Sequence, residues 1–239
     1  MTRPQTMEHS PSVGPSMPAL PPGQRARADF PRFGATAFAA FQAPISTPFT
    51  LLVAGDIEPI SLGQDDLAGL ERRHQVADFS CVATWSYRGL TWSGFRFRDL
   101  WEQLVQPRLA SSRPITLAAF SGLDGYKASL LLGDALAADV FIADALNGEP
   151  LSSKHGAPLR LVAPAHYGYK NVKHLCTIEF WQAATSYRSL LPSVMEHPRA
   201  RVAYEERGRI LPGWVFRYLY RPLIGHIVRT MNEHSSTRS

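Results

Sequence analysis

The stretch HGAPLRLVAPAHYGYKNVK, residues 155–173, is the part of the chain that is most informative about its fold. The run at 159–163, apolar except for Arg160, stops at Pro164, which is typical of a buried strand. The end of the stretch begins a run at 171–180 in which polar and apolar residues alternate, as expected for a second strand. We therefore expect two strands joined by a loop that is rich in glycine and aromatic residues.

The same region has an unusual distribution of charge. Between Glu149 and Glu179 the chain carries four lysines or arginines, three histidines and no acidic residue. Gly156 and Gly168 allow a ligand to approach the backbone closely. Cations combined with exposed backbone N–H groups favour an anion site, for which phosphate is the usual occupant. A solvated basic surface remains the alternative interpretation.

Working outward, the remaining chain is dominated by short strands. Strands are expected at 49–55, 76–82, 115–120, 126–132 and 139–146, the last followed by a hairpin turn at Asn147-Gly148. Short helices are expected within 61–70 and over 98–106. Because the pattern lacks a regular alternation of strand and helix, it predicts an α+β fold rather than a doubly wound sheet.

Cys81 ends the strand expected at 76–82 and leads into an aromatic segment, 81–92, that we expect to be a loop. A thiolate in that position can act as a nucleophile or a metal ligand, although a free cysteine is more often a small buried residue. Cys176 lies in the strand expected at 171–180, and we interpret it as structural. No cysteine-protease signature surrounds Cys81, and the histidines lack zinc-site spacing.

Composition excludes several classes of protein. The 239 residues are 45% hydrophobic and 19% charged, as in one or two globular domains, which excludes a coiled coil or a collagen-like repeat. Two cysteines are too few for a disulfide scaffold. The sequence contains no run of 18 apolar residues, so a standard membrane-spanning helix is not expected. Residues 1–23 are proline-rich and are expected to be a disordered lead. They contain neither an apolar signal region nor a twin-arginine pair, so we expect a cytoplasmic protein.

The net charge of +5 lies entirely in residues 199–239, which hold eight arginines and three glutamates. The neutral body argues against a nucleic-acid partner. Residues 214–229 predict a helix interrupted at Pro222. One face of it carries Phe216, Leu219, Tyr220 and Leu223. Packing against the domain is our first interpretation of the tail. Docking to a redox partner through 199–229 is an alternative, and contact with an anionic membrane is compatible with the pattern but not predicted.

Three motifs in order resemble the molybdopterin-binding domain of the sulfite oxidase family. They are FSCVATWS at 79–86, Asp124-Gly125-Tyr126, and the stretch at 155–173. Residues 20–34 also resemble the start of bacterial sulfite-oxidase-like oxidoreductases. The resemblance implies a β-rich, mixed-sheet α+β domain of sulfite oxidase type with short helices. Its expected limits are 24–185, after the lead at 1–23 and before a basic, apolar helical extension at 186–239.

The resemblance also implies a molybdopterin molybdenum cofactor with Cys81 as the metal ligand. Soft thiolate suits a metal that is already held by the sulfurs of the pterin. Cofactor contacts are implied for Thr116, His155, Arg160, Asn171, Val172 and Lys173, with Arg160 in the place of the arginine that binds the pterin phosphate. Cys81, Arg88 and Tyr126 form the expected catalytic set. Arg88 lies near the cysteine motif, where it is placed either on the surface, our first interpretation, or facing an oxyanion. Ser80 departs from the pattern, since relatives often carry histidine there.

These residues imply a molybdenum-dependent oxidoreductase that carries out oxygen-atom transfer, with sulfite or a sulfoxide as the candidate substrate. We expect the chain to exchange electrons with an external partner, because it has no room for a haem or dimerisation domain. The alternative is a non-catalytic molybdopterin carrier or assembly module. An intact Cys81 favours the enzyme, since a carrier has less need of a metal ligand.

Overall fold

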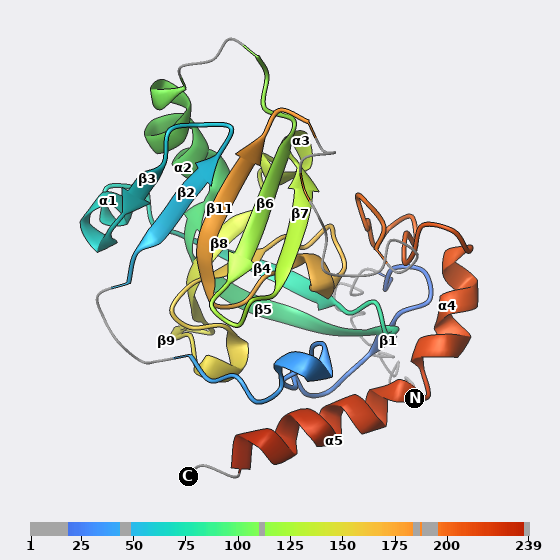
Figure 1. Ribbon diagram of the computed structural model, residues 1–239. Coiled ribbons are helices and arrows are strands. Elements are labelled where there is room, and N and C mark those ends of the chain that lie inside the picture. The colour runs from blue at the N-terminus through green and yellow to red at the C-terminus, as the bar shows by residue number, and fades with distance from the viewer. Residues whose placement is uncertain (1–18, 44–48, 110–112, 184–186, 188–195, 237–239) are drawn as a thin grey trace, which may run out of the picture.

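The computed structural model describes residues 19–43, 49–109, 113–183, 187 and 196–236. Most of the expected disordered lead, and most of the segment around the expected domain boundary at 185, therefore lie outside the described residues. The described part has two mixed β-sheets with short helices around them, and two longer helices follow at the C-terminal end (Figure 1). This arrangement confirms the α+β class with mixed sheets.

The first sheet has six strands in the order β1-β5-β8-β10, with β4 added to β5 and β9 to β8. Its strands are β1 (Arg25–Ala26), β4 (Arg73–Ser80), β5 (Trp85–Arg96), β8 (Phe141–Leu146), β9 (Glu149–Pro150) and β10 (Arg160–Val162). Only the pair β1–β5 is parallel in this sheet. The turn between β4 and β5 carries Cys81, and β10 carries Arg160, so this sheet positions two of the expected site residues.

The second sheet has five strands in the order β3-β2-β11-β6-β7. Its strands are β2 (Leu51–Gly55), β3 (Ile60–Leu62), β6 (Leu117–Gly122), β7 (Lys127–Leu131) and β11 (Leu175–Trp181). The pair β2–β11 is parallel and the other pairs are antiparallel. The turn between β6 and β7 holds Asp124, and β11 directly follows Lys173, so this sheet brings further residues to the same place.

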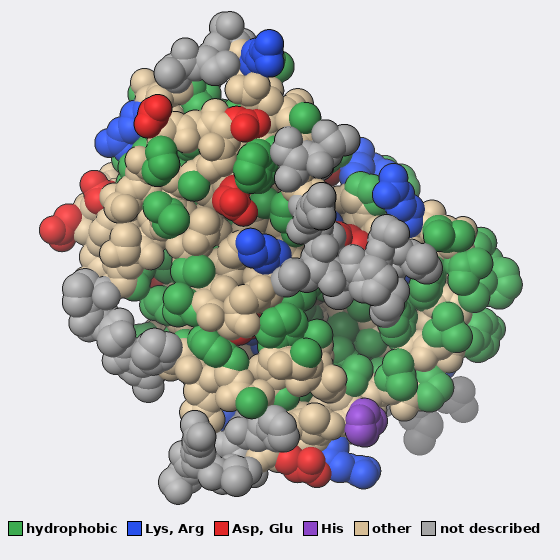
Figure 2. All heavy atoms as spheres, viewed as in Figure 1, with side chains coloured by type: hydrophobic (Ala, Val, Ile, Leu, Met, Phe, Trp, Pro, Cys, Tyr) green, Lys and Arg blue, Asp and Glu red, His purple; other side chains and the backbone are tan. Residues whose placement is uncertain are grey.

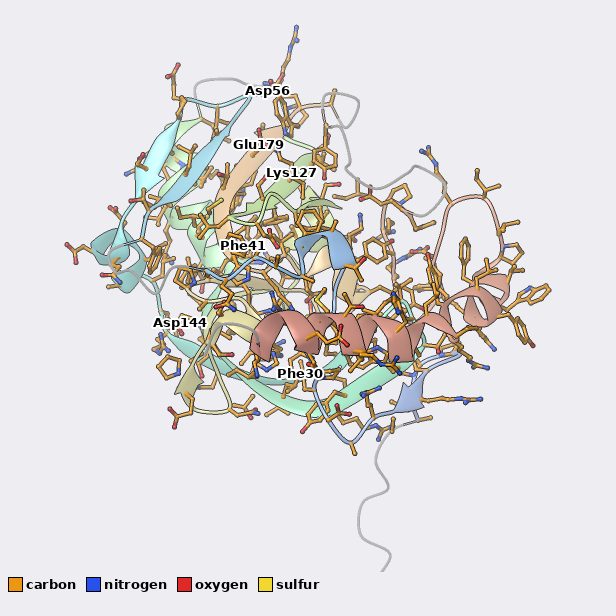
Figure 3. All side chains as sticks on the ribbon, turned by 60° about the horizontal axis from the view of Figure 1, so that its bottom comes forward. Phe30, Phe41, Asp56, Lys127, Asp144 and Glu179 are labelled. Carbon is orange, nitrogen blue, oxygen red and sulfur yellow. The ribbon has the colours of Figure 1, made fainter. Side chains whose placement is uncertain are left out.

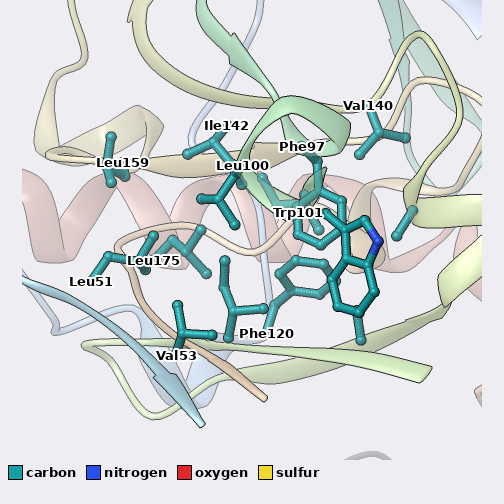
Figure 4. Packing of buried hydrophobic residues seen from close by; sticks show 14 of the residues in the cluster. Leu51, Val53, Phe97, Leu100, Trp101, Phe120, Val140, Ile142, Leu159 and Leu175 are labelled. Carbon is teal, nitrogen blue, oxygen red and sulfur yellow. The ribbon is translucent and has the colours of Figure 1, made fainter. Parts of the chain in front are cut away.

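The main hydrophobic core joins the two sheets. It combines fully buried side chains such as Val53 and Phe120 from the second sheet with Ile142 from the first (Figure 4). Phe97 and Trp101 fill the space between them, and the Trp101 ring lies 4.7 Å from the Phe180 ring. The core thereby fixes the two sheets relative to one another, which holds the site residues of both in place.

Helices are short in the body of the protein. They are α1 (Gln64–Ala68), α2 (Phe97–Leu100) continued by a π-helical turn (Trp101–Val105), and α3 (Leu132–Ala135). Single 3₁₀ turns occur at Thr36–Phe38, Gln106–Arg108, Ser153–His155 and Gly168–Lys170. The C-terminal helices are α4 (Gly213–Tyr220) and α5 (Leu223–Ser236). No helix among the described residues is long and apolar enough to cross a membrane.

The largest difference from the sequence prediction is β5. Residues 81–92 were expected to be a loop, but a tight turn at 82–84 leads directly into this strand, which is the longest of the described strands. Gly89 and Gly94 interrupt the sequence pattern, and both adopt positive φ, 69° and 156°. The pairing register of β5 shifts next to Gly94. A bent strand with glycines at its irregularities lacks the clean alternation from which strands are recognised.

The strand expected at 171–180 is also shorter than predicted, because β11 begins only at Leu175. His174 just before it has φ 54°, which ends the extended conformation. Residues 171–174 therefore leave the sheet, and Asn171, Lys173 and His174 line the cavity described below.

The C-terminal helices pack against the N-terminal segment and the Cys81 turn. In Figure 3, α5 runs across the molecule between the labelled Phe41 and Phe30. The predicted inner face is partly wrong, because Leu219 and Leu223 are 55% and 46% exposed. Phe216 and Met231 are buried, and Tyr220 and Ile224 pack on the cluster that contains Cys81. Helix α4 turns Phe216 inward and leaves Leu219 outside, and α5 begins at Leu223 as a separate helix after the break at 221–222.

Candidate active site

A cavity of about 240 Å³ opens where the two sheets, the N-terminal segment and the tail meet. Its wall is formed by residues 32–35 and 38, the Cys81 turn, Asp124 and Tyr126, several residues of 160–174, and side chains of α4 and α5. Of the nine residues expected to form the site, five line this cavity. They are Cys81, Tyr126, Arg160, Asn171 and Lys173.

The Cys81 turn is tightly constrained. The Cys81 amide donates to the Trp85 carbonyl oxygen at 2.8 Å, and the Thr84 amide donates to the Cys81 carbonyl oxygen at 3.1 Å. Thr84 has φ 76°, an unusual conformation for a β-branched residue. Such strain persists only where surrounding contacts enforce it, and it concentrates at functional sites. The turn thus holds the Cys81 side chain in one orientation towards the cavity.

The Cys81 thiol is buried, with 5% of the residue exposed. Burial raises the pKa of Cys81 to about 12, although the Ala83 amide and the positive charges of Arg207 and Lys173 act in the opposite direction. The Ala83 amide donates to Sγ at 3.4 Å. Cys81 is therefore a neutral thiol without a metal, and a bound cation is needed to stabilise its thiolate.

Arg160 is the most deeply buried cation of the cavity. It is 1% exposed, its guanidinium lies 4.7 Å from the centre of the Trp92 ring, and Nη1 donates to the His155 carbonyl oxygen at 2.8 Å. Burial lowers the pKa of Arg160 to about 9. Its Nε is buried without a hydrogen-bond partner. A buried donor without a partner is costly, so this group is suited to an acceptor that enters the cavity.

Lys173 supplies a second cation. Its Nζ donates to two backbone carbonyl oxygens, of Lys154 at 3.1 Å and Phe33 at 3.3 Å. Burial, followed by repulsion from Arg160 and Arg32, lowers the pKa of Lys173 to about 7. Cations that lie close together in a cavity of low polarity repel one another and are poorly solvated. A bound anion offsets both unfavourable contributions to the free energy.

Gly156 makes room for these cations. It has φ 107°, and a Cβ atom there would lie 3.0 Å from the Cβ of Lys173 and 3.2 Å from that of Arg160. Asn171 completes the loop, since its Oδ1 accepts from the Ala163 amide at 2.7 Å. Gly156 was expected to let a ligand approach the backbone, but it does not line the cavity, and its role in the structure is the close approach of the 155–160 and 171–174 segments.

Two further expected residues, His155 and Val172, lie outside the wall of the cavity. His155 does not line the cavity; its ring stacks on Phe30 with centroids 4.9 Å apart, and its carbonyl oxygen holds Arg160. Burial and neighbouring cations lower the pKa of His155 to about 4. Val172 also does not line the cavity, because its side chain is fully buried in the main core. Tyr126 does line it, and its hydroxyl donates to the Tyr169 carbonyl oxygen at 2.7 Å.

Thr116 and Arg88 are not brought to this cavity. Thr116 lies just before β6 and donates through Oγ1 to the Gln182 carbonyl oxygen at 2.9 Å, at the end of β6 that is remote from the turn with Asp124. Arg88 lies within β5, next to the irregularity at Gly89, because the segment expected to be a loop is a strand.

Sequence reasoning assigned no role to several residues that line the cavity. Arg32 and His174 add groups that carry or can gain positive charge, and burial lowers the pKa of each. Asp124 is the only carboxylate among the residues that line the described cavity. Arg32 lies in the family-like segment 20–34, and His174 lies in the stretch without acidic residues. Both could therefore have been chosen as site residues from the sequence. Tyr220, Ile227 and Met231 of the tail form an apolar wall that no motif indicated.

The donor set fits a molybdopterin cofactor. One buried thiol, an unpartnered Arg160 Nε and a second, partly buried cation lie around one cavity, which matches a ligand that carries both a thiophilic metal and a phosphate. Within the described residues no group of three or more His, Cys, Asp and Glu side chains is placed to hold a metal ion. A metal bound to Cys81 would thus depend on further ligands from its own cofactor.

Comparison with known proteins agrees with this geometry. Residues 40–188, more than half of the chain, match the family model of the oxidoreductase molybdopterin binding domain. The catalytic subunit of the protein-methionine-sulfoxide reductase MsrP from Xanthomonas axonopodis pv. citri is 29% identical over 67% of this chain and 57% of its own length. The uncharacterised oxidoreductase YuiH of Bacillus subtilis is 33% identical over 56% of this chain and 66% of its own length.

A solved structure supports the fold. The sulfane dehydrogenase SoxCD from Paracoccus pantotrophus superposes with a TM-score of 0.53 at 20% identity, over 67% of this chain and 46% of that one. The chain spans roughly half to two-thirds of the length of these relatives. With the family model, the fold and the cavity in agreement, the chain belongs to the molybdopterin-dependent oxidoreductases of the sulfite oxidase family.

Proposed function

We propose that this protein binds the molybdopterin molybdenum cofactor in the cavity at Cys81 and catalyses oxygen-atom transfer to or from a small sulfur compound. The observation that carries the proposal is the meeting of the Cys81 thiol with Arg160 and Lys173 in one cavity, because a metal ligand and a phosphate site are needed together. Electrons are exchanged with an external partner.

Each group has a distinct role in this proposal. When bound, the molybdenum cofactor supplies the two-electron chemistry of oxygen-atom transfer. Cys81, as the thiolate, would hold the metal through Sγ, and Arg160 and Lys173 would hold the phosphate through charge-assisted hydrogen bonds. The Asn171 side chain fixes the backbone of the loop through the Ala163 amide, and the apolar side chains of α5 exclude water.

An organic sulfoxide is the substrate that the cavity favours. Phe33, Val82, Ile227 and Met231 give it an apolar wall near Cys81, which suits a substrate with an apolar portion. Arg88, the candidate for facing an oxyanion, does not line the cavity. The similarity to methionine-sulfoxide reductases points in the same direction. Sulfite is the second candidate.

A non-catalytic cofactor carrier is the alternative function. It requires the phosphate site but not the metal ligand. The constrained turn and the strained Thr84 that present Cys81 to the cavity favour the enzyme, because a carrier gains nothing from holding a thiol in one orientation.

The Cys81→Ser variant tests the proposal, with Cys176→Ser as the matched control. Purified wild-type protein should contain molybdenum and pterin and reduce a sulfoxide with an artificial electron donor. Cys81→Ser should remain folded, since the change in volume is small, and should lose turnover. Cys176→Ser should retain it. Turnover at the wild-type rate in Cys81→Ser would refute the assignment, and cofactor without turnover in the wild type would support a carrier.

A further inference from the structure

Large exposed apolar side chains gather in one segment of the chain. Seven such residues lie between positions 204 and 223, and among the described residues only Leu52, Val76 and Leu123 are comparable elsewhere. We call these seven the apolar tail surface: Tyr204, Ile210, Leu211, Trp214, Tyr218, Leu219 and Leu223. Figure 2 shows hydrophobic side chains gathered over α4 at the right of the molecule. A contiguous surface of this kind on a folded domain marks a contact site.

Helix α4 carries apolar residues on both of its faces. Phe216 and Tyr220 point inward to the protein, whereas Trp214 and Tyr218, four residues apart, are 56% and 69% exposed on the other side. The only charged residue of α4, Arg217, is engaged by the Glu205 carboxylate. A helix that is apolar all round is normally covered on all sides, so the outer face of α4 needs a partner.

The composition of this segment identifies the kind of partner. Apart from glycine and proline, residues 207–224 contain only arginines and apolar or aromatic residues. Protein interfaces also concentrate aromatic residues and arginine, but they surround them with a polar rim, and apart from its arginines, tyrosines and tryptophan this segment has no polar side chain. Tryptophan, tyrosine and leucine flanked by arginine are instead typical of segments that lie in the headgroup region of a bilayer.

Charge supports the same partner. Arg209 is exposed, and neither Arg209 nor Arg221 forms an ion pair with another described residue. Residues 199–239 carry the whole net charge of +5. A second copy of this chain would bring two such tails together and suffer repulsion between like charges, whereas anionic lipid headgroups complement the tail.

We propose that the apolar tail surface attaches the protein to the face of an anionic lipid bilayer, with Trp214 and Tyr218 inserted at headgroup depth and arginines around them. Tyr220, on the inner side of the same helix, lines the cofactor cavity. Attachment therefore places that cavity close to the bilayer, where electron carriers dissolved in the membrane are within reach.

Vesicle co-sedimentation of the purified full-length protein tests this proposal. The wild type should sediment with vesicles of mixed phosphatidylcholine and phosphatidylglycerol, bind those of phosphatidylcholine alone more weakly, and dissociate as salt is added. The Trp214→Ser/Tyr218→Ser double variant changes exposed side chains only and should lower the partition coefficient by at least roughly tenfold. Val76→Ser is the matched control, since Val76 is equally exposed but lies on β4, and it should bind like the wild type.

Three results would overturn the proposal. The first is a wild type that does not sediment with anionic vesicles. The second is equal sedimentation of the wild type and the double variant while both keep the same melting temperature. The third is a dimer seen in sedimentation velocity that the double variant abolishes, which would assign the surface to a second copy. Sulfoxide reductase activity is measured in a separate assay with a soluble electron donor. A protein without that activity can still bind vesicles, so the two proposals can fail independently.

Discussion

Arg207, in the C-terminal segment, donates a hydrogen bond to the carbonyl oxygen of Val82, the residue that follows Cys81. Its guanidinium is fully buried, lies 4.9 Å from the centre of the Tyr167 ring and pairs with Glu205. From the other end of the chain, Gln24 donates to the Cys81 carbonyl oxygen at 3.1 Å. Both residues lie outside the segment that matches the family model, 40–188. The turn that presents Cys81 is therefore held by flanking segments.

The first prediction follows from this contact. Arg207→Met should lower the free energy of unfolding by about 2 kcal/mol, because it removes a charge-assisted hydrogen bond to the Val82 carbonyl oxygen and one of the two arginines that pair with Glu205. Arg209→Met is the control; Arg209 is exposed, so its replacement should change stability by less than about 0.5 kcal/mol. Urea denaturation of both variants measures the difference, and equal midpoints would contradict the role given to Arg207.

Much of this organisation was predictable from the sequence, and the exceptions have physical causes. The buried run that became β10 and the hairpin turn at Asn147-Gly148 were recognised correctly, because each is coded by neighbouring residues. β5 was missed because its glycine irregularities hide the alternation. Local patterns specify local elements, whereas a bent strand is defined by its partners on both sides.

The site was predictable to a similar degree. Cys81, Arg160 and Lys173 belong to motifs, and the structure brings them to one cavity. Thr116 was assigned by position relative to Cys81, and the path of the intervening strand places it elsewhere. The tail residues Ile227 and Met231 carry no signal except helical periodicity, which cannot say which surface the helix will cover.

The second prediction concerns the packing of the tail. Phe216 is 4% exposed and Tyr218 is 69% exposed, although both are aromatic residues of α4. Phe216→Ala should destabilise the protein by about 3 kcal/mol because it leaves a cavity, whereas Tyr218→Ala should have an effect below about 0.5 kcal/mol. Thermal and urea denaturation report both values. Similar destabilisation by the two variants would mean that α4 does not rest on the protein as described.

The third prediction uses two glycines that share an unusual backbone conformation. Gly156 and Gly148 have φ of 107° and 87°, so alanine at either position should cost about 1–2 kcal/mol of conformational strain. Only Gly156 is crowded, by Lys173 and Arg160, while nothing lies within 4 Å of a Cβ atom at Gly148. We therefore expect Gly156→Ala to lower the molybdenum and pterin content of the purified protein, and Gly148→Ala to leave it unchanged.

Equal cofactor content in the two variants would show that the spacing of the 155–160 and 171–174 segments does not matter for binding. Loss of cofactor in both would instead trace the effect to general destabilisation. The measured unfolding midpoints separate these two results, because the strain is shared by both glycines and the crowding is not.

The last prediction concerns Lys173 and pH. Its pKa is lowered to about 7 by burial and by Arg160 and Arg32, so in cofactor-free protein the amine is charged below that pH and neutral above it. An anion binds the charged amine. Its affinity should therefore be fully present below pH 7 and should weaken as pH rises, by up to about tenfold per pH unit, because binding then requires uptake of a proton. Sulfate is the appropriate probe, since its own charge does not change in this range.

Titration calorimetry of the cofactor-free protein with sulfate measures this dependence, and Lys173→Met provides the comparison. The variant should bind sulfate weakly through Arg160, whose pKa of about 9 keeps it charged near neutrality, and should show no change in affinity around pH 7. Proton uptake in the wild type should appear as a binding enthalpy that varies with the ionisation enthalpy of the buffer. An affinity that is independent of pH in the wild type, or equally dependent in the variant, would remove Lys173 from the anion site.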